Sequence, residues 1–139
     1  MSIFYADDDQ DDRFFFGEAI EEINHDIDLI TADNADLLIE MLKQKPVPPL
    51  LIFLDLNMPG KNGIEALKEI KSNNSFKDFP VVIFTTSSDR DAIERTRKLG
   101  ADGFITKPGK FEALKNLISQ CIERNWKTHQ VTDQNFVVR

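Results

Sequence analysis

The chain has 139 residues, of which 41% are hydrophobic, and its formal net charge is -7. This length suits one ordinary domain with a real core and leaves no room for a second. The 17 basic residues are scattered among 24 acidic ones, which argues against direct binding of nucleic acid. A single cysteine excludes an internal disulfide, and the apolar N-terminal run is too short for a signal peptide or membrane span, so we expect a cytoplasmic protein.

Apolar runs rich in β-branched and aromatic residues alternate along the chain with segments of helical period. We predict, in chain order, a strand at 3–6, a helix at 11–24, a strand at 27–31, a helix at 34–45, a strand at 50–54, a helix at 63–73, a strand at 81–84, a helix at 89–99, a strand at 103–106 and a helix at 110–125. Strands that are apolar throughout are typical of a parallel sheet with helices on both faces. We therefore predict a doubly wound α/β domain at 1–125, then a C-terminal extension at 126–139 and no output domain.

Polar side chains follow four of the five predicted strands. Asp7 and Asp8 come after the first strand, Asp55 after the third, Thr85 after the fourth and Lys107 after the fifth. In open parallel sheets, ligands bind at the carboxyl ends of the strands, where the strand order reverses. If the order is 2-1-3-4-5, the first and third strands are neighbours at that point. The three carboxylates would then lie together.

The segment at 7–12 contains five aspartates. Two carboxylates about 5 Å apart repel by roughly 3 kcal/mol at an effective dielectric near 20, so this crowding needs a positive partner. Some of the acids precede a predicted helix, where carboxylates cap free N–H groups and complement the helix dipole. We assign that capping role to Asp9, Asp11 and Asp12. Asp7 and Asp8 could also be caps, but their place beside Asp55 favours a cation site, and clustered oxygen ligands suit Mg²⁺.

These residues resemble the receiver domain of bacterial two-component response regulators over residues 3–124. The intervals of 30 residues from Asp55 to Thr85 and of 22 from Thr85 to Lys107 match the family pattern, as does the stretch GADGFITKP. The resemblance implies that Asp55 accepts a phosphoryl group, that Thr85 donates a hydrogen bond to it, and that Lys107 pairs with it or with Asp55. A carboxylate nucleophile of this kind works by alignment and charge stabilisation.

Further roles follow from the same resemblance. Asp8 and Asp55 would bind Mg²⁺ directly, with Asp7 contributing through water and Asn57 through its backbone carbonyl. Phe104 would be the switch aromatic that turns inward as Thr85 moves towards the phosphate, although it could equally be a plain core residue. The side chains of Asn57 and Ser87, two positions beyond the phosphoacceptor and the hydroxyl, would tune dephosphorylation.

The resemblance also implies partners. The phosphoryl donor would be a sensor histidine kinase or a histidine phosphotransfer protein, and the output would be binding of an unknown downstream protein through the last two helices and the last strand. The extension carries apolar residues that need burial: Trp126, Phe136, Val137 and Val138. We expect it to pack on that face, or on a second copy of it to give a homodimer; otherwise it folds back on its own subunit or frays. Small receivers paired with phytochrome-type kinases have a similar extension.

Two other function classes remain open at this point. A phosphatase of the haloacid dehalogenase type also uses an aspartate after a strand, but it needs a second acid two residues on, where this chain has Asn57. A flavodoxin-like ligand carrier would need phosphate-cradling glycines after a strand, and none is seen. Sustained phosphate release from a small ester would favour the phosphatase, whereas a single labelling event per chain would favour the receiver.

Overall fold

Five strands and five helices alternate along residues 1–44 and 47–139, the part of the chain that the computed structural model describes. The elements are β1 (Ser2–Ala6), α1 (Gln10–Ile23), β2 (Asp28–Ala32), α2 (Ala35–Gln44), β3 (Leu51–Leu54), α3 (Gly63–Ser72), β4 (Val81–Thr85), α4 (Arg90–Lys98), β5 (Gly103–Thr106) and α5 (Phe111–Glu123). Every predicted element is present, and its ends differ from the predicted ones by at most two residues. Residue 45, the last of the helix predicted at 34–45, lies outside the described residues.

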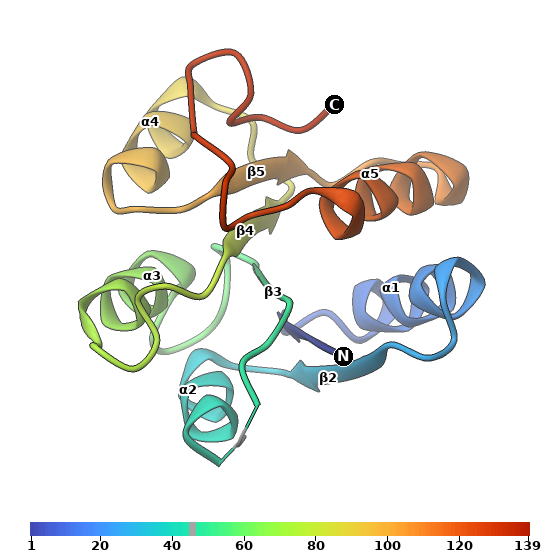
Figure 1. The fold of residues 1–139 in the computed structure, drawn as a ribbon, viewed down its shortest axis with the longest axis horizontal. Helices are drawn as coiled ribbons and strands as arrows, with labels where there is room; N and C mark the ends of the chain where they lie inside the picture. Colours follow the sequence, from blue (N-terminus) through green and yellow to red (C-terminus); the bar gives the residue numbers. More distant parts are fainter. Residues whose placement is uncertain (45–46) are drawn as a thin grey trace.

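The strands form one parallel sheet in the order β2-β1-β3-β4-β5, as predicted. β1 lies between β2 and β3, with Phe4 in register with Ile30 on one side and Ile52 on the other. Figure 1 shows α1 and α5 on one face of the sheet and α2, α3 and α4 on the other. The strand order reverses beside β1, so the carboxyl ends of β1 and β3 form the edge where such folds bind ligands.

Each face of the sheet buries its own hydrophobic core. Alternate residues of β1 divide between the two: Phe4 belongs to the core under α2, α3 and α4, and Tyr5 to the core under α1 and α5. In the second core Tyr5 stacks on Phe16 with 4.2 Å between ring centroids. Burial on both faces explains why the strands are apolar throughout. None of the helices in the described part of the chain has the length and apolar character that a membrane span requires.

The C-terminal extension returns from the end of α5 to the free edge of β5 (Figure 1). Trp126 anchors its start, because the indole Nε1 donates to the backbone oxygen of Cys121 at 2.9 Å. Further on, the Phe104 N–H donates to Phe136 O and the Val138 N–H donates to Phe104 O, each at 2.9 Å. The extension therefore packs on the α4–β5–α5 face of its own subunit, one of the expected arrangements. The homodimer stays a prediction.

Candidate functional site

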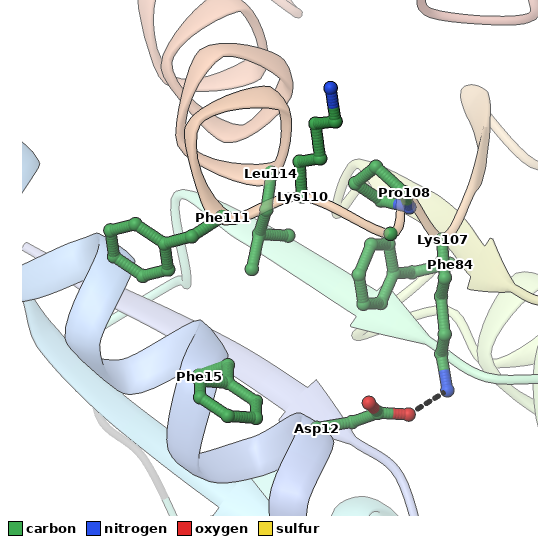
Figure 2. Close-up of a pocket in the computed structure, with 9 residues that line it drawn as sticks. Asp12, Phe15, Phe84, Lys107, Pro108, Lys110, Phe111 and Leu114 are labelled. Atoms are coloured by element: carbon green, nitrogen blue, oxygen red, sulfur yellow. Dashed lines mark hydrogen bonds and ion pairs between the residues drawn. The ribbon is translucent and has the colours of Figure 1, made fainter.

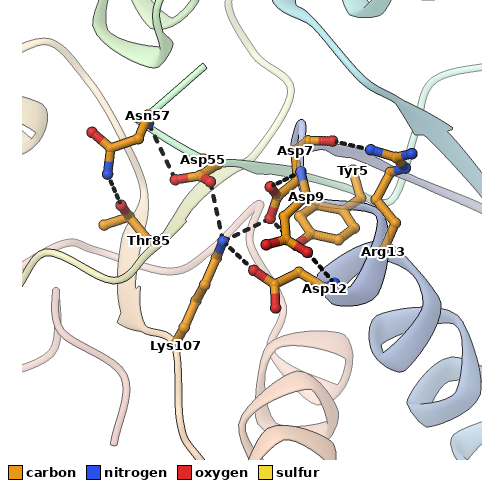
Figure 3. Close-up of polar contacts among 9 residues, drawn as sticks. All are labelled: Tyr5, Asp7, Asp9, Asp12, Arg13, Asp55, Asn57, Thr85 and Lys107. Carbon is orange, nitrogen blue, oxygen red and sulfur yellow. Dashed lines mark hydrogen bonds and ion pairs between the residues drawn. The ribbon is translucent and has the colours of Figure 1, made fainter. Parts of the chain in front are cut away.

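The sheet itself brings the predicted site residues to one edge. The backbone N–H of Asp55 donates to Ala6 O at 3.0 Å, which fixes the residue after β3 beside the end of β1. In the same way, the Lys107 N–H donates to Thr85 O at 2.8 Å and fixes the residue after β5 beside the end of β4. These bonds prolong the ladders of the sheet beyond its strands. The side chains of Asp7, Asp55, Thr85 and Lys107 therefore lie together at this edge of the sheet (Figure 3).

Lys107 lies at the centre of the cluster. Its Nζ donates to Asp7 Oδ2 at 2.7 Å, to Asp12 Oδ2 at 2.8 Å and to Asp55 Oδ2 at 3.1 Å (Figure 3). Burial alone would lower the pKa of Lys107, but the hydrogen bonds to Asp12 and Asp7 and the charge of Asp55 outweigh it and raise that pKa above its ordinary value. The ammonium group therefore stays charged at neutral pH and neutralises one of the carboxylates around it.

Asp7 is fully buried, and protein groups already occupy both of its carboxylate oxygens. Oδ2 accepts from the Tyr5 hydroxyl as well as from Lys107, and Oδ1 accepts from the backbone N–H of Asp9 at 2.9 Å. Arg13 Nη1 holds the Asp7 carbonyl at 2.7 Å. Burial, and then the hydrogen bond to Asp7, raises the pKa of Tyr5, so the phenol stays protonated and keeps donating. Asp7 is thus oriented from several sides.

Asp55 is 4% exposed, so only a small part of its carboxylate reaches solvent. Its Oδ1 accepts from the Asn57 N–H at 3.2 Å, and its Oδ2 accepts from Lys107. Burial and the charge of Asp7 raise the pKa of the Asp55 carboxyl, although Lys107 and the Asn57 N–H act in the opposite direction. Ionisation of Asp55 therefore destabilises the folded state, and an additional positive charge beside it would offset this cost.

The loop after β3 folds back tightly below Asp55. The Gly63 N–H donates to Leu56 O at 3.0 Å, and a Cβ atom at Gly63 would lie only 2.2 Å from the Asp55 carbonyl oxygen. No L side chain fits that space without moving the backbone of Asp55. Glycine at this position therefore helps to set where the Asp55 carboxylate lies.

The other predicted site residues, Thr85, Phe104 and Ser87, each have their own contacts. Thr85 is fully buried, and its Oγ1 accepts from Asn57 Nδ2 at 3.4 Å. Phe104 is fully buried as well and packs against Phe136, with 6.2 Å between ring centroids. The Ser87 hydroxyl donates to Asp89 Oδ2 at 3.0 Å, so it supports the residue that caps α4. Asn57 thus links Asp55 to Thr85, whereas the contacts described for Ser87 and Phe104 are with Asp89 and Phe136.

The capping interpretation is correct for Asp9 and incomplete for Asp12. Asp9 is the N-cap of α1, and its Oδ1 accepts from the Asp12 N–H at 3.0 Å. Asp11 lies in the first turn, as expected. The side chain of Asp12, however, accepts a hydrogen bond from Lys107, a contact that the sequence does not predict because ninety-five positions separate the two residues. Its place in the first turn of a helix that starts at the carboxyl edge was the only signal.

Three carboxylates meet at a point where a cation could bind. One oxygen each from Asp7, Asp8 and Asp55 can be chosen so that all lie within 4.8 Å of one another, and Asp8 is exposed. The donors are all oxygen atoms, which suits hard divalent cations such as Mg²⁺. Lys107 supplies one positive charge against several negative ones, so the cluster retains excess negative charge. The residues present therefore fit a divalent cation.

A cavity of about 280 Å³ opens beside the cluster, between α1 and the start of α5. Asp12 and Lys107 lie at its end nearest the cluster, and Phe15, Phe84 and Phe111 give it apolar walls (Figure 2). Phe15 is 51% exposed, unusually high for an aromatic side chain beside a polar site. This cavity with apolar walls was not predicted from the sequence, because only the packing of α1 against α5 creates it.

Comparisons with known proteins agree with the fold described above. A family model described as the response regulator receiver domain matches residues 3–119. Response regulator Rcp1 of Synechocystis sp. is 41% identical over 78 residues, which are 56% of this chain and 52% of that protein, so the match spans about half of that relative. The structure of the phosphorylated cyanobacterial phytochrome response regulator RcpA aligns with a TM-score of 0.80 at 30% identity, over 94% of this chain and 96% of that one. The Mn²⁺-bound form of Rcp1 aligns with a TM-score of 0.78 at 28% identity, over 94% and 98%.

Proposed function

The chain belongs to the response regulator receiver family, and from that premise we propose that it is a cytoplasmic phosphoacceptor whose nucleophile is Asp55. The phosphoryl donor is the phosphohistidine of a sensor histidine kinase or of a histidine phosphotransfer protein. The observation that carries the proposal is the placement of Asp55 between Lys107 and the Asn57–Thr85 pair at the carboxyl edge of the sheet. The output is a conformational change that alters binding of a downstream protein.

In the proposed reaction an Asp55 carboxylate oxygen forms a bond to phosphorus. The P–N bond of the phosphohistidine breaks, and the imidazole leaves with the electron pair. Such transfers depend on alignment and on stabilising the charge of the phosphoryl oxygens. Lys107 already lies 3.1 Å from Asp55 Oδ2 and can follow the charge to the new phosphoryl group. Because Asn57 Nδ2 donates to Thr85 Oγ1, the Thr85 hydroxyl hydrogen is free to donate to a phosphoryl oxygen.

A divalent cation, which the resemblance indicates to be Mg²⁺, would neutralise the acidic cluster and the incoming phosphoryl oxygens when bound. Asp8 and Asp55 would hold it directly and Asn57 through its carbonyl. The protein contacts on both oxygens of Asp7 favour its contribution through water. The Mn²⁺-bound form of the related protein Rcp1 supports a divalent cation in this fold.

Two pairs of residues would act after the transfer. Thr85 and Phe104 form the proposed switch, and the register places them two residues apart on neighbouring strands, since Phe104 pairs with Ile83. Asn57 and Ser87 would control the access of water to the acyl phosphate. The decay rate of labelled protein after Ser87→Ala measures this role; an unchanged rate would remove Ser87 from it.

Labelling stoichiometry tests the proposed function. Incubation with acetyl phosphate and Mg²⁺ should add one phosphoryl group per chain, because one carboxylate is positioned for attack and Asn57 stands where a phosphatase needs an acid. Intact-mass spectrometry measures the label, and a phosphate assay measures release. Sustained release of many equivalents from a small ester would instead establish a phosphatase of the haloacid dehalogenase type.

Mg²⁺ should raise the melting temperature of the protein, because it binds the folded cluster and relieves carboxylate repulsion. At about ten times the Kd we expect a rise of roughly 5 °C. Asp8→Ala should abolish the response and raise the melting temperature of the metal-free protein. Asp11→Ala is the matched control, since it removes an exposed acid of the same region that lies outside the cluster. An unshifted parent protein at millimolar Mg²⁺ would contradict the cation site.

A further inference from the structure

Asp12 binds Lys107 but has no role in the reaction proposed above. It lies in the first turn of α1, three positions after the N-cap Asp9. In many helices the side chain at this position reaches back to the N–H of the N-cap residue. Here the Asp9 N–H donates instead to Asp7 Oδ1 at 2.9 Å. The Asp12 carboxylate is therefore left to Lys107, whose Nζ donates to its Oδ2 at 2.8 Å.

The three N–H groups of the Lys107 ammonium each have a carboxylate within reach. They donate to Asp12, to Asp7 Oδ2 at 2.7 Å and to Asp55 Oδ2 at 3.1 Å. An ammonium has no fourth donor. The oxygens of a phosphoryl group on Asp55 lie beyond Oδ2, so Nζ has to shift to reach them. This shift takes Lys107 away from at least one of its other two partners.

Asp12 is the partner that Lys107 can leave at the lower cost. The Asp7 side chain is fully buried, and loss of the cation beside a buried carboxylate is strongly destabilising. The Asp12 side chain is 35% exposed and borders the cavity of about 280 Å³, so it can be hydrated after release. Figure 3 shows Asp12 and Thr85 on opposite sides of the Lys107 ammonium. Movement of Nζ towards a phosphoryl group bound by Thr85 is therefore movement away from Asp12.

We propose that Asp12 is a positioning residue that holds Lys107 on the α1 side of the site and releases it when Asp55 carries a phosphoryl group. Asp12 competes with the phosphoryl group for a donor of Lys107, and this competition weakens the phosphorylated state. Its carboxylate is separate from the three that converge on the cation site, those of Asp7, Asp8 and Asp55. The inference rests on the proposed function, because it requires Asp55 as the acceptor.

Binding of beryllofluoride with Mg²⁺, a stable mimic of the phosphoryl group, tests the competition at equilibrium. Fluorine NMR separates bound from free mimic and gives an apparent Kd. Asp12→Asn should bind the mimic about fivefold more tightly than the parent, because partly exposed ion pairs contribute up to about that factor. A merely structural role of Asp12 in α1 would not tighten binding. Asp12→Glu, which keeps a carboxylate within reach of Lys107, should restore the Kd of the parent.

The matched control is Asp11→Asn, which removes the same charge from an exposed position in the same turn of α1. It should change the Kd by less than about twofold, because salt and solvent screen exposed charges. An equal gain in Asp11→Asn, or no gain in Asp12→Asn, would overturn the proposal. A parent protein that binds no mimic would reject the proposed function itself, and this inference with it.

A double substitution shows whether the effect passes through Lys107. In a Lys107→Met chain, Asp12→Asn should no longer tighten binding, because no ammonium is left to release. A gain that persists in Lys107→Met would overturn the proposal. If Lys107→Met fails to fold or to bind the mimic, Lys107→Arg takes its place. The guanidinium has five N–H donors, so three carboxylates do not exhaust it and the gain from Asp12→Asn should shrink; an undiminished gain would again contradict the competition.

Discussion

Asp55→Asn is expected to reduce phosphoryl labelling by acetyl phosphate and Mg²⁺ to background. The amide has the shape of the carboxylate, but it lacks the charge and the nucleophilic oxygen that attack phosphorus. Among the buried acids of the cluster, Asp7 is fully buried and held by protein donors at both oxygens, whereas Asp55 is 4% exposed and its Oδ2 is held by Lys107, whose ammonium can move to a phosphoryl group. The remaining carboxylates should therefore not be labelled in place of Asp55. Intact-mass spectra of the variant measure this.

A stability measurement accompanies this labelling experiment. Burial and the charge of Asp7 raise the pKa of Asp55, so the folded state favours its protonated form, and the stability from that proton is lost as the pH rises through the folded-state pKa. Asp55→Asn should therefore unfold at higher urea than the metal-free parent at neutral pH. Asp91→Asn, an exposed acid in the first turn of α4, should retain full labelling. Equal labelling of Asp55→Asn and its parent would place the nucleophile elsewhere.

Lys107→Met should destabilise the metal-free protein by about 3 kcal/mol at neutral pH. The variant keeps the length of the side chain but removes the ammonium that donates to three carboxylates, at 2.7, 2.8 and 3.1 Å. Asp7 and Asp55 are buried, so neither recovers its hydration in exchange. Urea unfolding with the slope unchanged measures the loss. The exposed-pair control Lys115→Met, which removes a contact of 3.2 Å to Glu22, should cost below about 1 kcal/mol.

The loss of stability in Lys107→Met should depend on pH and on the charge of Asp55. Without Lys107 an influence that lowers the pKa of Asp55 is gone, so the folded carboxyl takes up a proton at higher pH than in the parent. The deficit should therefore be full at neutral pH and shrink as the pH falls through that raised pKa. Adding Asp55→Asn to Lys107→Met should recover part of the loss. A loss no larger than that of Lys115→Met would show that Lys107 does not hold the cluster together.

The placement of the site was largely predictable because it depends on local signals. Each strand is an apolar run, and the residue after it must lie at the carboxyl edge, so Asp7, Asp55 and Lys107 could be brought together from the sequence. The contact between Asp12 and Lys107 could not be predicted, since it depends on how α1 is oriented over the sheet. The location of a residue that follows a strand can be predicted from the sequence. The location of a side chain that depends on helix packing cannot.

The extension illustrates a different limit. The apolar side chains of Phe136 and Val138 indicated burial, and both are buried. We expected the extension on the face of the last two helices and the last strand, but the sequence pattern does not say which residues pair with β5 or on which subunit, because pairing at a sheet edge is non-local and two copies of one chain offer the same edge. Only the packed structure places one residue in each core.

Trp126, the single tryptophan of the chain, lies at the base of the extension and far along the chain from the acidic cluster. Its indole is fixed by Cys121 O, lies under the guanidinium of Arg124 at 5.1 Å and contacts the ring of His129 at 5.2 Å between centroids. Ultraviolet emission from this protein thus has one dominant source, placed where the extension leaves the domain. Emission intensity and anisotropy accordingly report how the extension is seated, and they do so without a label or a reporter enzyme.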